Sequence, residues 1–425
     1  MSLAPRRQQQ QQQRIGTPSE DAYRRDLTIN ALFYNINTRA VEDFTGRGVS
    51  DLRAGIVRTP LAPLETFCDD PLRVLRSIRF AARLGFRCEP GLLSAAAAPV
   101  VRDALRSKIS RERIGKELSL MMLAPRFDVA VGLLHHVGLW NAVFRLPETI
   151  LPASSSDSST RTNDVEGTET DTEGTDGNTE ATWDGAESVR IVGLVVAHEA
   201  LPGTRDEDEE TMRKCVLLGA LLYPLRAREY LTPKKRRDAV THFVVLDSLK
   251  LSSREAHGAQ LAQSVAAELG GIMREIIATG SAAPVLPRGR FGMLLRRAGP
   301  AWVHALGLAA CALVVAGDVP ADVSSAKAAV LQLHATYQLG NAWEQRPLVS
   351  VCGFPFFLPA SSLHHTALTC CHHTHDKQGI ELCTALEKKR GPWIQPALEK
   401  EFEWMFDHPA ASREDCLTWA KRTIE

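Results

Sequence analysis

Apolar residues recur at helical spacing through most of this chain. Positions three or four residues apart are apolar in 71–84, 114–122, 129–143 and 189–340. A period of about 3.6 residues predicts helices that bury one face and expose the other. From Pro71 onward the pattern therefore predicts an all-helical region.

One short segment near the N-terminus follows a different pattern. Leu32 to Tyr34 and Ala40 to Phe44 are strand-like runs, and the polar Asn37-Thr38-Arg39 lies between them. Two such runs around a polar turn predict a β-hairpin. Together with the helices, this predicts an α+β fold in which a small α/β region precedes a long helical one.

Two segments contain almost no large apolar residues and are expected to be disordered. One is 1–16, which includes a glutamine tract, and the other is 151–188, which is rich in Ser, Thr, Asp, Glu and Gly. The expected bounds of the remaining segments are 17–66, 67–150, 189–345 and 346–425. A length of 425 residues allows two or three domains that each bury a core.

Composition sets limits on the compartment and on membrane association. Nine cysteines form no regular framework, so we expect a reducing intracellular compartment and no structural disulfides. Composition does not distinguish cytoplasm, nucleus and mitochondrion. The longest apolar run, Val303 to Gly317, is shorter than the roughly 20 residues that span a bilayer. We expect a buried helix there and no membrane association.

The net charge of zero hides an uneven distribution. Residues 1–151 contain 22 Lys and Arg against 15 Asp and Glu, whereas 152–188 contain one Arg against ten Asp and Glu. A basic first part suits a polyanionic partner such as a nucleic acid, although the net charge alone argues against one.

A helix with a basic face is predicted after Asp70-Pro71, because an acidic residue followed by proline is a helix-start signal. Four arginines share one face of this helix: Arg73, Arg76, Arg79 and Arg83. Like charges on one face repel each other unless an anion neutralises them, so phosphate binding is one interpretation. A solvated helix face is the other.

The start of this helix also carries a pair of groups that could read a base. Asp70 can accept a hydrogen bond from an amino group, and Arg73 can donate one to a ring nitrogen. Cytosine and adenine both present that pattern, whereas guanine and uracil present a carbonyl and a ring N–H. The pair would therefore select C and A. The alternative is that Asp70 only caps the helix.

A second polar cluster precedes the hairpin. Tandem Arg24 and Arg25 could bind a triphosphate, and Asp26 or Asn30 could bond a ribose hydroxyl. The alternative is a capped helix on the surface.

Four segments in this order resemble successive motifs of one enzyme family. They read RRDLTINALFYN, DFTGRGVSDLRAGIVRTP, DDPLRVLRSIRFAARLGF and SRERIGKEL. They are similar to the class II family of CCA-adding tRNA nucleotidyltransferases and poly(A) polymerases. The resemblance covers 17–150 strongly. In the tail, Gly391 to Ile394 and Asp407 to Pro409 resemble the eukaryotic-type CCA-adding branch.

The resemblance implies a fold, a reaction and roles for residues. It implies that 17–66 is the remainder of a nucleotidyltransferase head, 67–150 a helical neck, 189–345 a helical body and 346–425 a tRNA-binding tail. Asp70 and Arg73, assisted by Asp69, would form the template for CTP and ATP. Arg25, Arg76 and Arg79 would bind the incoming nucleotide or its phosphates, and Asp26 would sense the ribose, beside the Arg24 and Asn30 considered above.

The family reaction also implies Mg²⁺ held by paired carboxylates, upstream of the first motif. The 23 residues before Arg24 contain no Asp-x-Asp and no glycine pair, and Asp171-Thr172-Glu173 lies in the expected disordered insert. No catalytic residue or metal ligand is identifiable from the sequence. We therefore expect an N-terminally truncated, inactive chain, a shortened isoform or a non-catalytic relative.

A histidine- and cysteine-rich stretch between His364 and Cys383 is a weaker candidate. Its ligand types suit Zn²⁺ but its spacing does not, so an unstructured loop is the preferred interpretation. The expected partners are tRNA, CTP and ATP, with the oligomeric state unknown. The alternatives are a poly(A) polymerase of the same fold and a non-catalytic RNA-binding relative.

Overall fold

A computed structural model describes residues 16–151, 183–199, 201–203, 205–282, 285–340, 342–345, 386–388 and 391–424. The chain divides into two compact units, Met1–Gln260 and Leu261–Glu425. All but residue 16 of the predicted disordered N-terminus lies outside the described residues. The whole histidine- and cysteine-rich stretch also lies outside them.

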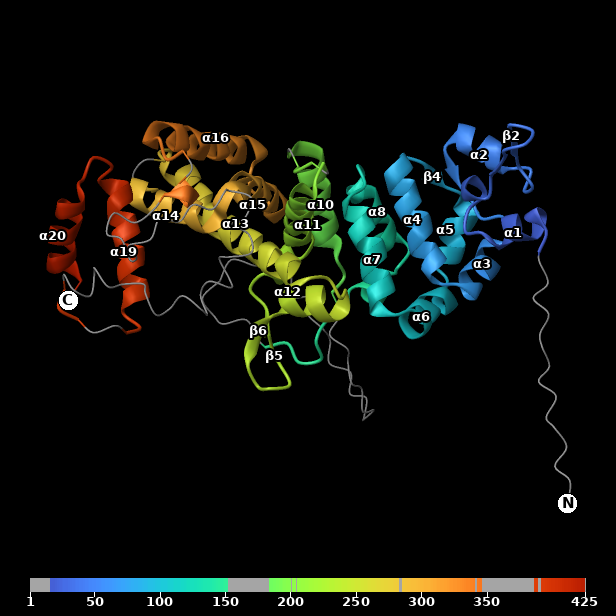
Figure 1. The fold of residues 1–425 in the computed structure, drawn as a ribbon, viewed down its shortest axis with the longest axis horizontal. Helices are drawn as coiled ribbons and strands as arrows, with labels where there is room; N and C mark the ends of the chain where they lie inside the picture. The colour runs from blue at the N-terminus through green and yellow to red at the C-terminus, as the bar shows by residue number, and fades with distance from the viewer. Residues whose placement is uncertain are drawn as a thin grey trace, which may run out of the picture. The chain divides into compact units, whose positions relative to one another are not determined.

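The first unit begins with a small α/β region and continues as helices (Figure 1). Its α/β region contains α1 (Pro18–Arg24), η1 (Thr28–Asn30), β1 (Phe33–Asn35), β2 (Ala40–Glu42), α2 (Gly48–Ala54) and β3 (Ile56–Val57). The helices that follow are α3 (Pro63–Asp69), α4 (Leu72–Leu84), α5 (Pro90–Ala96), α6 (Pro99–Lys108), α7 (Arg111–Met122), α8 (Phe127–His136) and α9 (Trp140–Val143). Strand β4 (Arg87–Cys88) follows α4 and pairs in parallel with β3.

The unit continues from residue 183 with further helices and a second hairpin. These are α10 (Ala186–His198), α11 (Glu207–Leu221), η2 (Tyr223–Leu225), β5 (Glu229–Leu231), β6 (Arg237–Ala239), α12 (Val240–Phe243) and η3 (Val244–Ser248). Helix α13 (Ser253–Thr279) begins in this unit.

The predicted α+β fold is confirmed, with two corrections. The predicted hairpin forms, with Phe33 opposite Glu42 and Asn35 opposite Ala40. The helical body also contains an antiparallel hairpin, β5–β6, because Pro233 and four cations interrupt the apolar helical pattern there. The predicted disordered insert, 151–188, extends too far at its C-terminal end. Trp183 is buried against Trp140, with 4.9 Å between ring centroids, and α10 starts at Ala186.

Helix α4 shows how the sequence builds the scaffold of the site. Its apolar face is buried, including Val74, Leu75 and Ile78, and it packs against α7 and α8. Burial of each such side chain contributes roughly 1.5–3 kcal/mol. Gly85 ends the helix with φ of 68°, which a residue with a side chain adopts less readily. The arginines of α4 are therefore held on a fixed, packed helix.

Arg111 fastens segments that lie far apart in the sequence. Its guanidinium donates to the carbonyl oxygens of Ser248 (2.5 Å), Ala142 (2.8 Å) and Val143. Burial, with smaller effects of neighbouring arginine charges, lowers the pKa of Arg111 to about 10. The guanidinium also donates to the Ser248 hydroxyl (2.9 Å), so this half-buried cation ties α7 to both α9 and η3.

Gly115 allows α7 to approach the backbone after η3. A Cβ atom there would lie 1.7 Å from the carbonyl oxygen of Leu249, with backbone on both sides of the contact.

Gly115→Ala is expected to lower the free energy of unfolding by about 1–3 kcal/mol or more, since the backbones must separate. Gly132→Ala in α8 is the matched control: nothing lies within 4 Å of its Cβ position, and alanine should stabilise by up to about 1 kcal/mol. Urea denaturation checks both, and equal effects would contradict the close approach.

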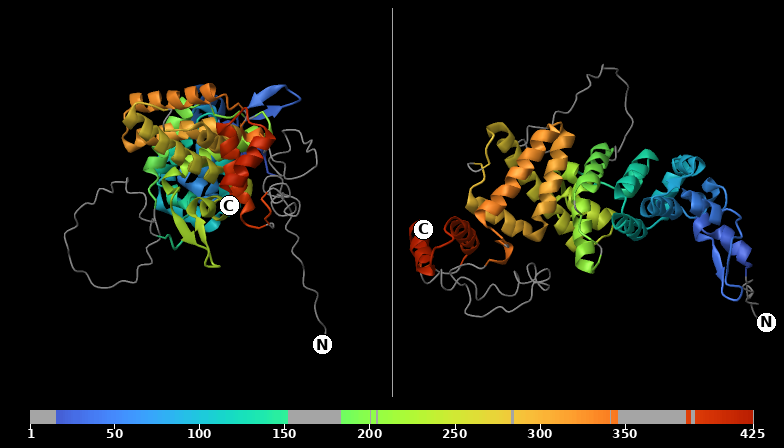
Figure 2. Two further views of the ribbon diagram at one scale, coloured as in Figure 1. Left: turned by 90° about the vertical axis from the view of Figure 1, so that its left-hand side faces the viewer. Right: turned by 90° about the horizontal axis from the view of Figure 1, so that it is seen from above.

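The second unit contains the rest of α13 and a helical group. Its elements are α14 (Arg288–Ala298), η4 (Gly299–Ala301), α15 (Trp302–Ala316), α16 (Pro320–Tyr337), η5 (Ala342–Glu344), α19 (Ile394–Asp407) and α20 (Arg413–Thr423). Figure 2 shows these helices from two further directions. Helix α14 packs against α19, where Gly292 leaves room for the buried ring of Phe406.

The apolar run of this unit forms a helix, as predicted. Most of α15 is buried, including Leu306, Leu308 and Leu313. The longer stretch Arg288–Ala316 meets the length and hydropathy of a membrane span, and 56% of its apolar window is buried inside the protein. A core helix meets the same criteria, so the absence of membrane association stays a prediction.

Candidate functional site

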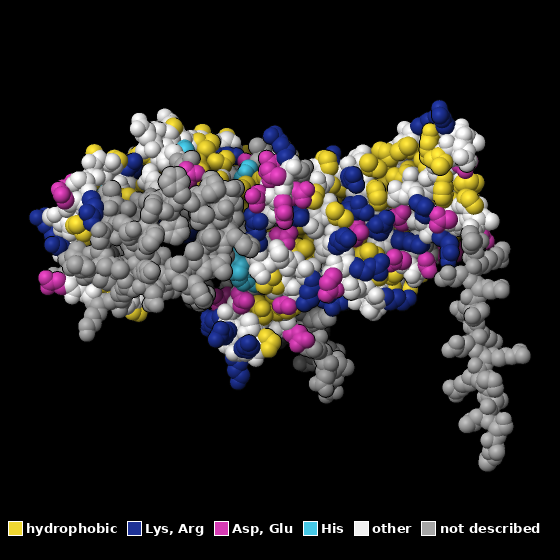
Figure 3. Space-filling model, in the orientation of Figure 1, with side chains coloured by type: hydrophobic (Ala, Val, Ile, Leu, Met, Phe, Trp, Pro, Cys, Tyr) yellow, Lys and Arg dark blue, Asp and Glu magenta, His cyan; other side chains and the backbone are white. Residues whose placement is uncertain are grey.

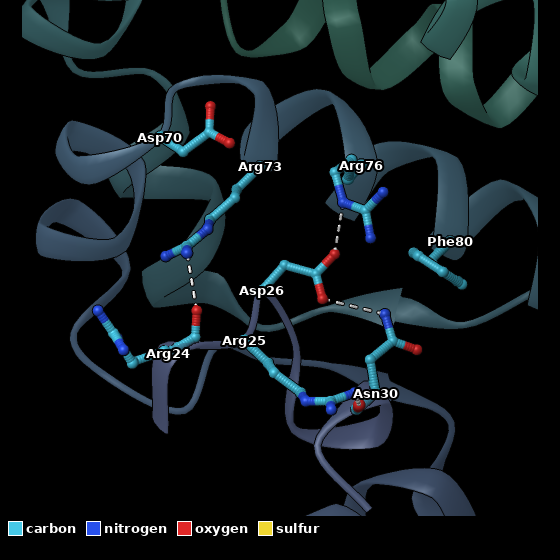
Figure 4. Close-up of a pocket in the computed structure, with 8 residues that line it drawn as sticks. All are labelled: Arg24, Arg25, Asp26, Asn30, Asp70, Arg73, Arg76 and Phe80. Atoms are coloured by element: carbon cyan, nitrogen blue, oxygen red, sulfur yellow. Dashed lines mark hydrogen bonds and ion pairs between the residues drawn. The ribbon is translucent and has the colours of Figure 1, made fainter. Parts of the chain in front are cut away.

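An open pocket of about 500 Å³ lies beside α1 and α4 in the first unit (Figure 4). Its lining residues are Arg24, Arg25, Asp26, Asn30, Asp70, Arg73, Arg76 and Phe80. All of these except Phe80 were predicted from the sequence. The volume is within the range of small-molecule sites, roughly 300–1,000 Å³. Four arginines against two aspartates leave an excess of positive charge, which suits an anionic ligand.

The end of α1 supplies two of the arginines. Arg24 is the last residue of the helix and Arg25 is its extended C-cap. Arg25 is engaged: its Nη2 lies 2.8 Å from Asp21 Oδ2, its Nη1 donates to the carbonyl oxygen of Asn30 (3.1 Å), and its guanidinium lies over the Phe33 ring. Arg24 is exposed, and no ion pair of its side chain is present within the described ranges. Arg24 is therefore the freer cation at the pocket.

Asp26 connects the loop after α1 to α4. Its side chain is buried, and Arg76 Nε donates to its Oδ2 at 2.7 Å. Its Oδ1 accepts from Asn30 Nδ2 (3.1 Å) and from the backbone N–H of Leu27 (3.0 Å). These bonds fix the carboxylate at the floor of the pocket, so Asp26, Asn30 and Arg76 form one polar unit rather than separate groups.

Asp70 and Arg73 both line the pocket but do not point at one another. Asp70 Oδ1 accepts the backbone N–H of Leu72 (3.1 Å), and its Oδ2 lies 3.1 Å from Arg113 Nη2. Arg73 Nη2 donates to the carbonyl oxygen of Arg24 (2.7 Å) (Figure 4). The capping of the helix start by Asp70, considered from the sequence, is thus present. For Asp70 and Arg73 to read one base edge together, Arg73 must release the carbonyl oxygen of Arg24.

Two predicted residues lie outside the pocket. Asp69 projects into solvent, with 73% of its side chain exposed, and pairs with Arg73 at 3.3 Å. Arg79 is 7% exposed, and its Nε donates to Glu117 Oε2 at 2.6 Å. Arg79 therefore contacts the helix behind the site, and Asp69 is at its margin.

Three residues of the site were missed in the sequence. Phe80 forms an apolar wall beneath Arg79, 4.5 Å from its guanidinium. Arg113 and Glu117, from the segment SRERIGKEL, hold Asp70 and Arg79. A signal was available: Arg113 and Glu117 are four residues apart, so they share one face of α7, and that face meets the basic face of α4.

The described residues do not form a metal site. Among them, no group of three or more His, Cys, Asp or Glu side chains is arranged to hold a metal ion. The two carboxylates of the pocket are bound by Arg76 and Arg113. They do not fit the paired carboxylates that a two-metal reaction uses.

Comparisons with known proteins agree with the motifs. A family model described as the poly A polymerase head domain matches residues 2–58. The mitochondrial CCA tRNA nucleotidyltransferase of Saccharomyces cerevisiae is 30% identical over 423 residues, covering 96% of this chain and 70% of that protein.

Two solved structures share the fold. The Bacillus stearothermophilus CCA-adding enzyme in complex with CTP has a TM-score of 0.54 at 17% identity, covering 96% of this chain and 75% of that one. The Thermotoga maritima CCA-adding enzyme complexed with tRNA has a TM-score of 0.51 at 16% identity, covering 96% and 74%. The similarity in fold to these two structures therefore covers nearly the whole chain.

Proposed function

Because the chain belongs to the CCA tRNA nucleotidyltransferase family, we propose that it selects CTP and ATP for addition of CCA to the 3′ end of tRNA. The observation that carries this proposal is the pocket, which gathers four arginines and two aspartates from the two motifs. An arginine-rich site suits a triphosphate, and the carboxylates suit a ribose hydroxyl and a base amino group.

Each side chain receives a role from its place in the pocket. Arg24, Arg25 and Arg76 bind the triphosphate, and Asp26 with Asn30 bonds the ribose. Asp70 and Arg73 read the base, with Arg73 exchanging the Arg24 carbonyl for the base. The apolar ring of Phe80 packs against the bound nucleotide. Asp69 assists by holding Arg73, to which it is already paired.

The tRNA is bound by elements beyond the pocket. We assign 17–66 to the head, 67–150 to the neck, 189–345 to the body and 346–425 to the tail. Recognition of phosphates and of stem shape suits a protein that serves every tRNA. The yeast relative is named as mitochondrial, and we place this chain inside the cell.

Divalent metal, with Mg²⁺ as the expected ion, would supply charge stabilisation at the reacting phosphate. Among the described residues no cluster of three or more His, Cys, Asp or Glu could hold such an ion, and the roles given above are those of binding and orienting the nucleotide.

Arg24→Ala is expected to weaken CTP binding about tenfold, because it removes a charged donor that lacks a described ion-pair partner. Binding of cytidine, which lacks phosphates, should not change. The matched control is Arg53→Ala, an exposed arginine of α2 outside the pocket. Isothermal titration calorimetry measures both. If cytidine binding falls as much as CTP binding, Arg24 does not act on the phosphates.

The reaction is tested with labelled CTP and ATP on tRNA lacking its 3′ CCA, in the presence of Mg²⁺. This chain is compared with a version extended upstream to the next in-frame start. Incorporation of C before A by either form supports CCA addition. Incorporation of A alone supports a poly(A) polymerase, which the name of the matching head domain favours. Binding of tRNA with no incorporation by either form supports a non-catalytic relative, which the lack of a metal site among the described residues favours.

A further inference from the structure

We propose that the hairpin formed by residues 229–239, here called the cationic hairpin, docks the phosphate backbone of RNA; this rests on the proposed tRNA substrate. The hairpin belongs to the same compact unit as the pocket. Strands β5 and β6 pair from Glu229 opposite Ala239 to Leu231 opposite Arg237. Four consecutive cations lie at this end of the hairpin: Lys234, Lys235 and Arg236 in the turn, and Arg237 at the start of β6.

These cations are exposed and mostly lack acidic partners. Across the described ranges, no carboxylate lies within ion-pair distance of the side chains of Lys234, Lys235 or Arg236. Arg237 reaches Glu229 at 3.6 Å, and both side chains are at least half exposed. A pair of that kind contributes little in water. The turn therefore keeps its positive charge for a partner.

The nearby acids are already engaged. Asp238 Oδ1 lies 2.8 Å from His242 Nδ1, and Asp247 Oδ1 lies 3.5 Å from Lys250 Nζ. They line the hollow of about 420 Å³ beside the turn, and their ion-pair partners among the described residues are His242 and Lys250. Figure 3 shows Lys and Arg side chains gathered at the end of the projecting hairpin.

The hairpin is built to hold this charge in place. At its base Tyr230 is buried, its ring 5.4 Å from that of Phe243, and Leu151 donates its backbone N–H to the Glu229 carbonyl (2.8 Å). At the turn, Thr232 exchanges three hydrogen bonds with the backbone of Arg236. Anchored cations lose less conformational entropy on binding than mobile ones do.

The backbone of the turn also places a lysine where a residue with a side chain is disfavoured. Lys235 adopts φ of 57°, a region where glycine or asparagine is usual and where lysine costs about 1 kcal/mol. Between Thr232 and Arg237 the one apolar side chain is Pro233. A protein partner normally needs aromatic or aliphatic anchors, whereas phosphates need cations and tolerate any sequence. An RNA backbone is therefore the partner that fits.

The test is binding of a tRNA lacking its 3′ CCA to the whole chain, measured between 50 and 200 mM salt. The variant Lys234→Ser/Lys235→Ser/Arg236→Ser is expected to bind about tenfold more weakly at 50 mM salt, with a slope of log K against log salt shallower by about 2 to 3. The charge-keeping variant Lys234→Arg/Lys235→Arg/Arg236→Lys should bind like the wild type. Unchanged thermal unfolding shows that the exposed substitutions leave the fold intact.

Unchanged tRNA affinity and salt slope in the serine variant would overturn the proposal. So would an equal loss in the charge-keeping variant, since charge would then not be the cause. Binding of CTP is measured in parallel and reports on the pocket. If the wild type does not prefer CTP and ATP, the proposed function is wrong. If it does prefer them and the serine variant keeps the wild-type salt slope, this inference alone is wrong.

Discussion

Asp70→Ala is expected to improve binding of GTP and UTP relative to CTP and ATP by about 10- to 100-fold. In the proposed complex the carboxylate accepts from the amino group of cytosine or adenine and faces the carbonyl oxygen of guanine or uracil, so its removal would abolish both an attraction and a repulsion. Each unpaired polar group costs about 1–3 kcal/mol. Its partner Arg113 is half exposed, so loss of their ion pair leaves no buried charge. Competition against labelled CTP measures the change for all four nucleotides.

The matched control for this prediction is Asp103→Ala. It makes the same change of charge at an exposed position of α6 outside the pocket, and selectivity should stay that of the wild type. If Asp70→Ala lowers the melting temperature while selectivity is unchanged, Asp70 serves only the helix start, through its bond to Leu72.

Glu117→Ala should lower the free energy of unfolding by about 3–5 kcal/mol, because it leaves Arg79 as an uncompensated buried charge. Arg79→Ala should lower it less, because Arg76 Nη1 still lies 3.8 Å from Glu117 Oε1. The two residues are 7% and 5% exposed, and the bond between their side chains is 2.6 Å long. The double variant Arg79→Met/Glu117→Leu removes both charges and should be more stable than either single variant. Urea denaturation followed by circular dichroism measures all three.

Arg83→Ala is the control for the Arg79 series. Arg83 lies on α4, is exposed and does not line the pocket, so its removal should change stability by no more than about 0.5 kcal/mol. If Arg79→Ala is as stable as the wild type and loses CTP binding instead, Arg79 is a phosphate ligand, as the family resemblance implied, and its bond to Glu117 is secondary.

The sequence predicted the helices and strands that depend on a few neighbouring residues. Helical periodicity placed α4 and α7, and the polar turn at Asn37-Thr38-Arg39 placed the first hairpin, because both patterns act over a few neighbouring residues. Two motifs some 45 residues apart, around Arg24 and Asp70, were both predicted to bind nucleotide, and the structure brings them into one pocket. That they share it depends on packing that no single window of sequence contains.

What could not be predicted depends on contacts between distant helices. Arg73, Arg76, Arg79 and Arg83 share a helical face by spacing alone, yet only the first two line the pocket. Arg79 donates instead to Glu117, 38 residues further along the chain, whereas Arg76 lies between Glu117 and the pocket residue Asp26. The cationic hairpin was missed because its three-residue strands lie inside 189–340, where the helical pattern dominates. The strands of the first hairpin are equally short, but no helical pattern surrounds them.

The central claim is that the pocket beside α4 selects C and A nucleotides. Equilibrium binding of CTP, ATP, GTP and UTP to the unmodified chain tests it most directly. The account predicts that CTP and ATP bind at least tenfold more tightly than GTP and UTP, and that Arg24→Ala weakens CTP without erasing the preference. Equal binding of all four nucleotides, or a preference that survives loss of Asp70, would contradict it.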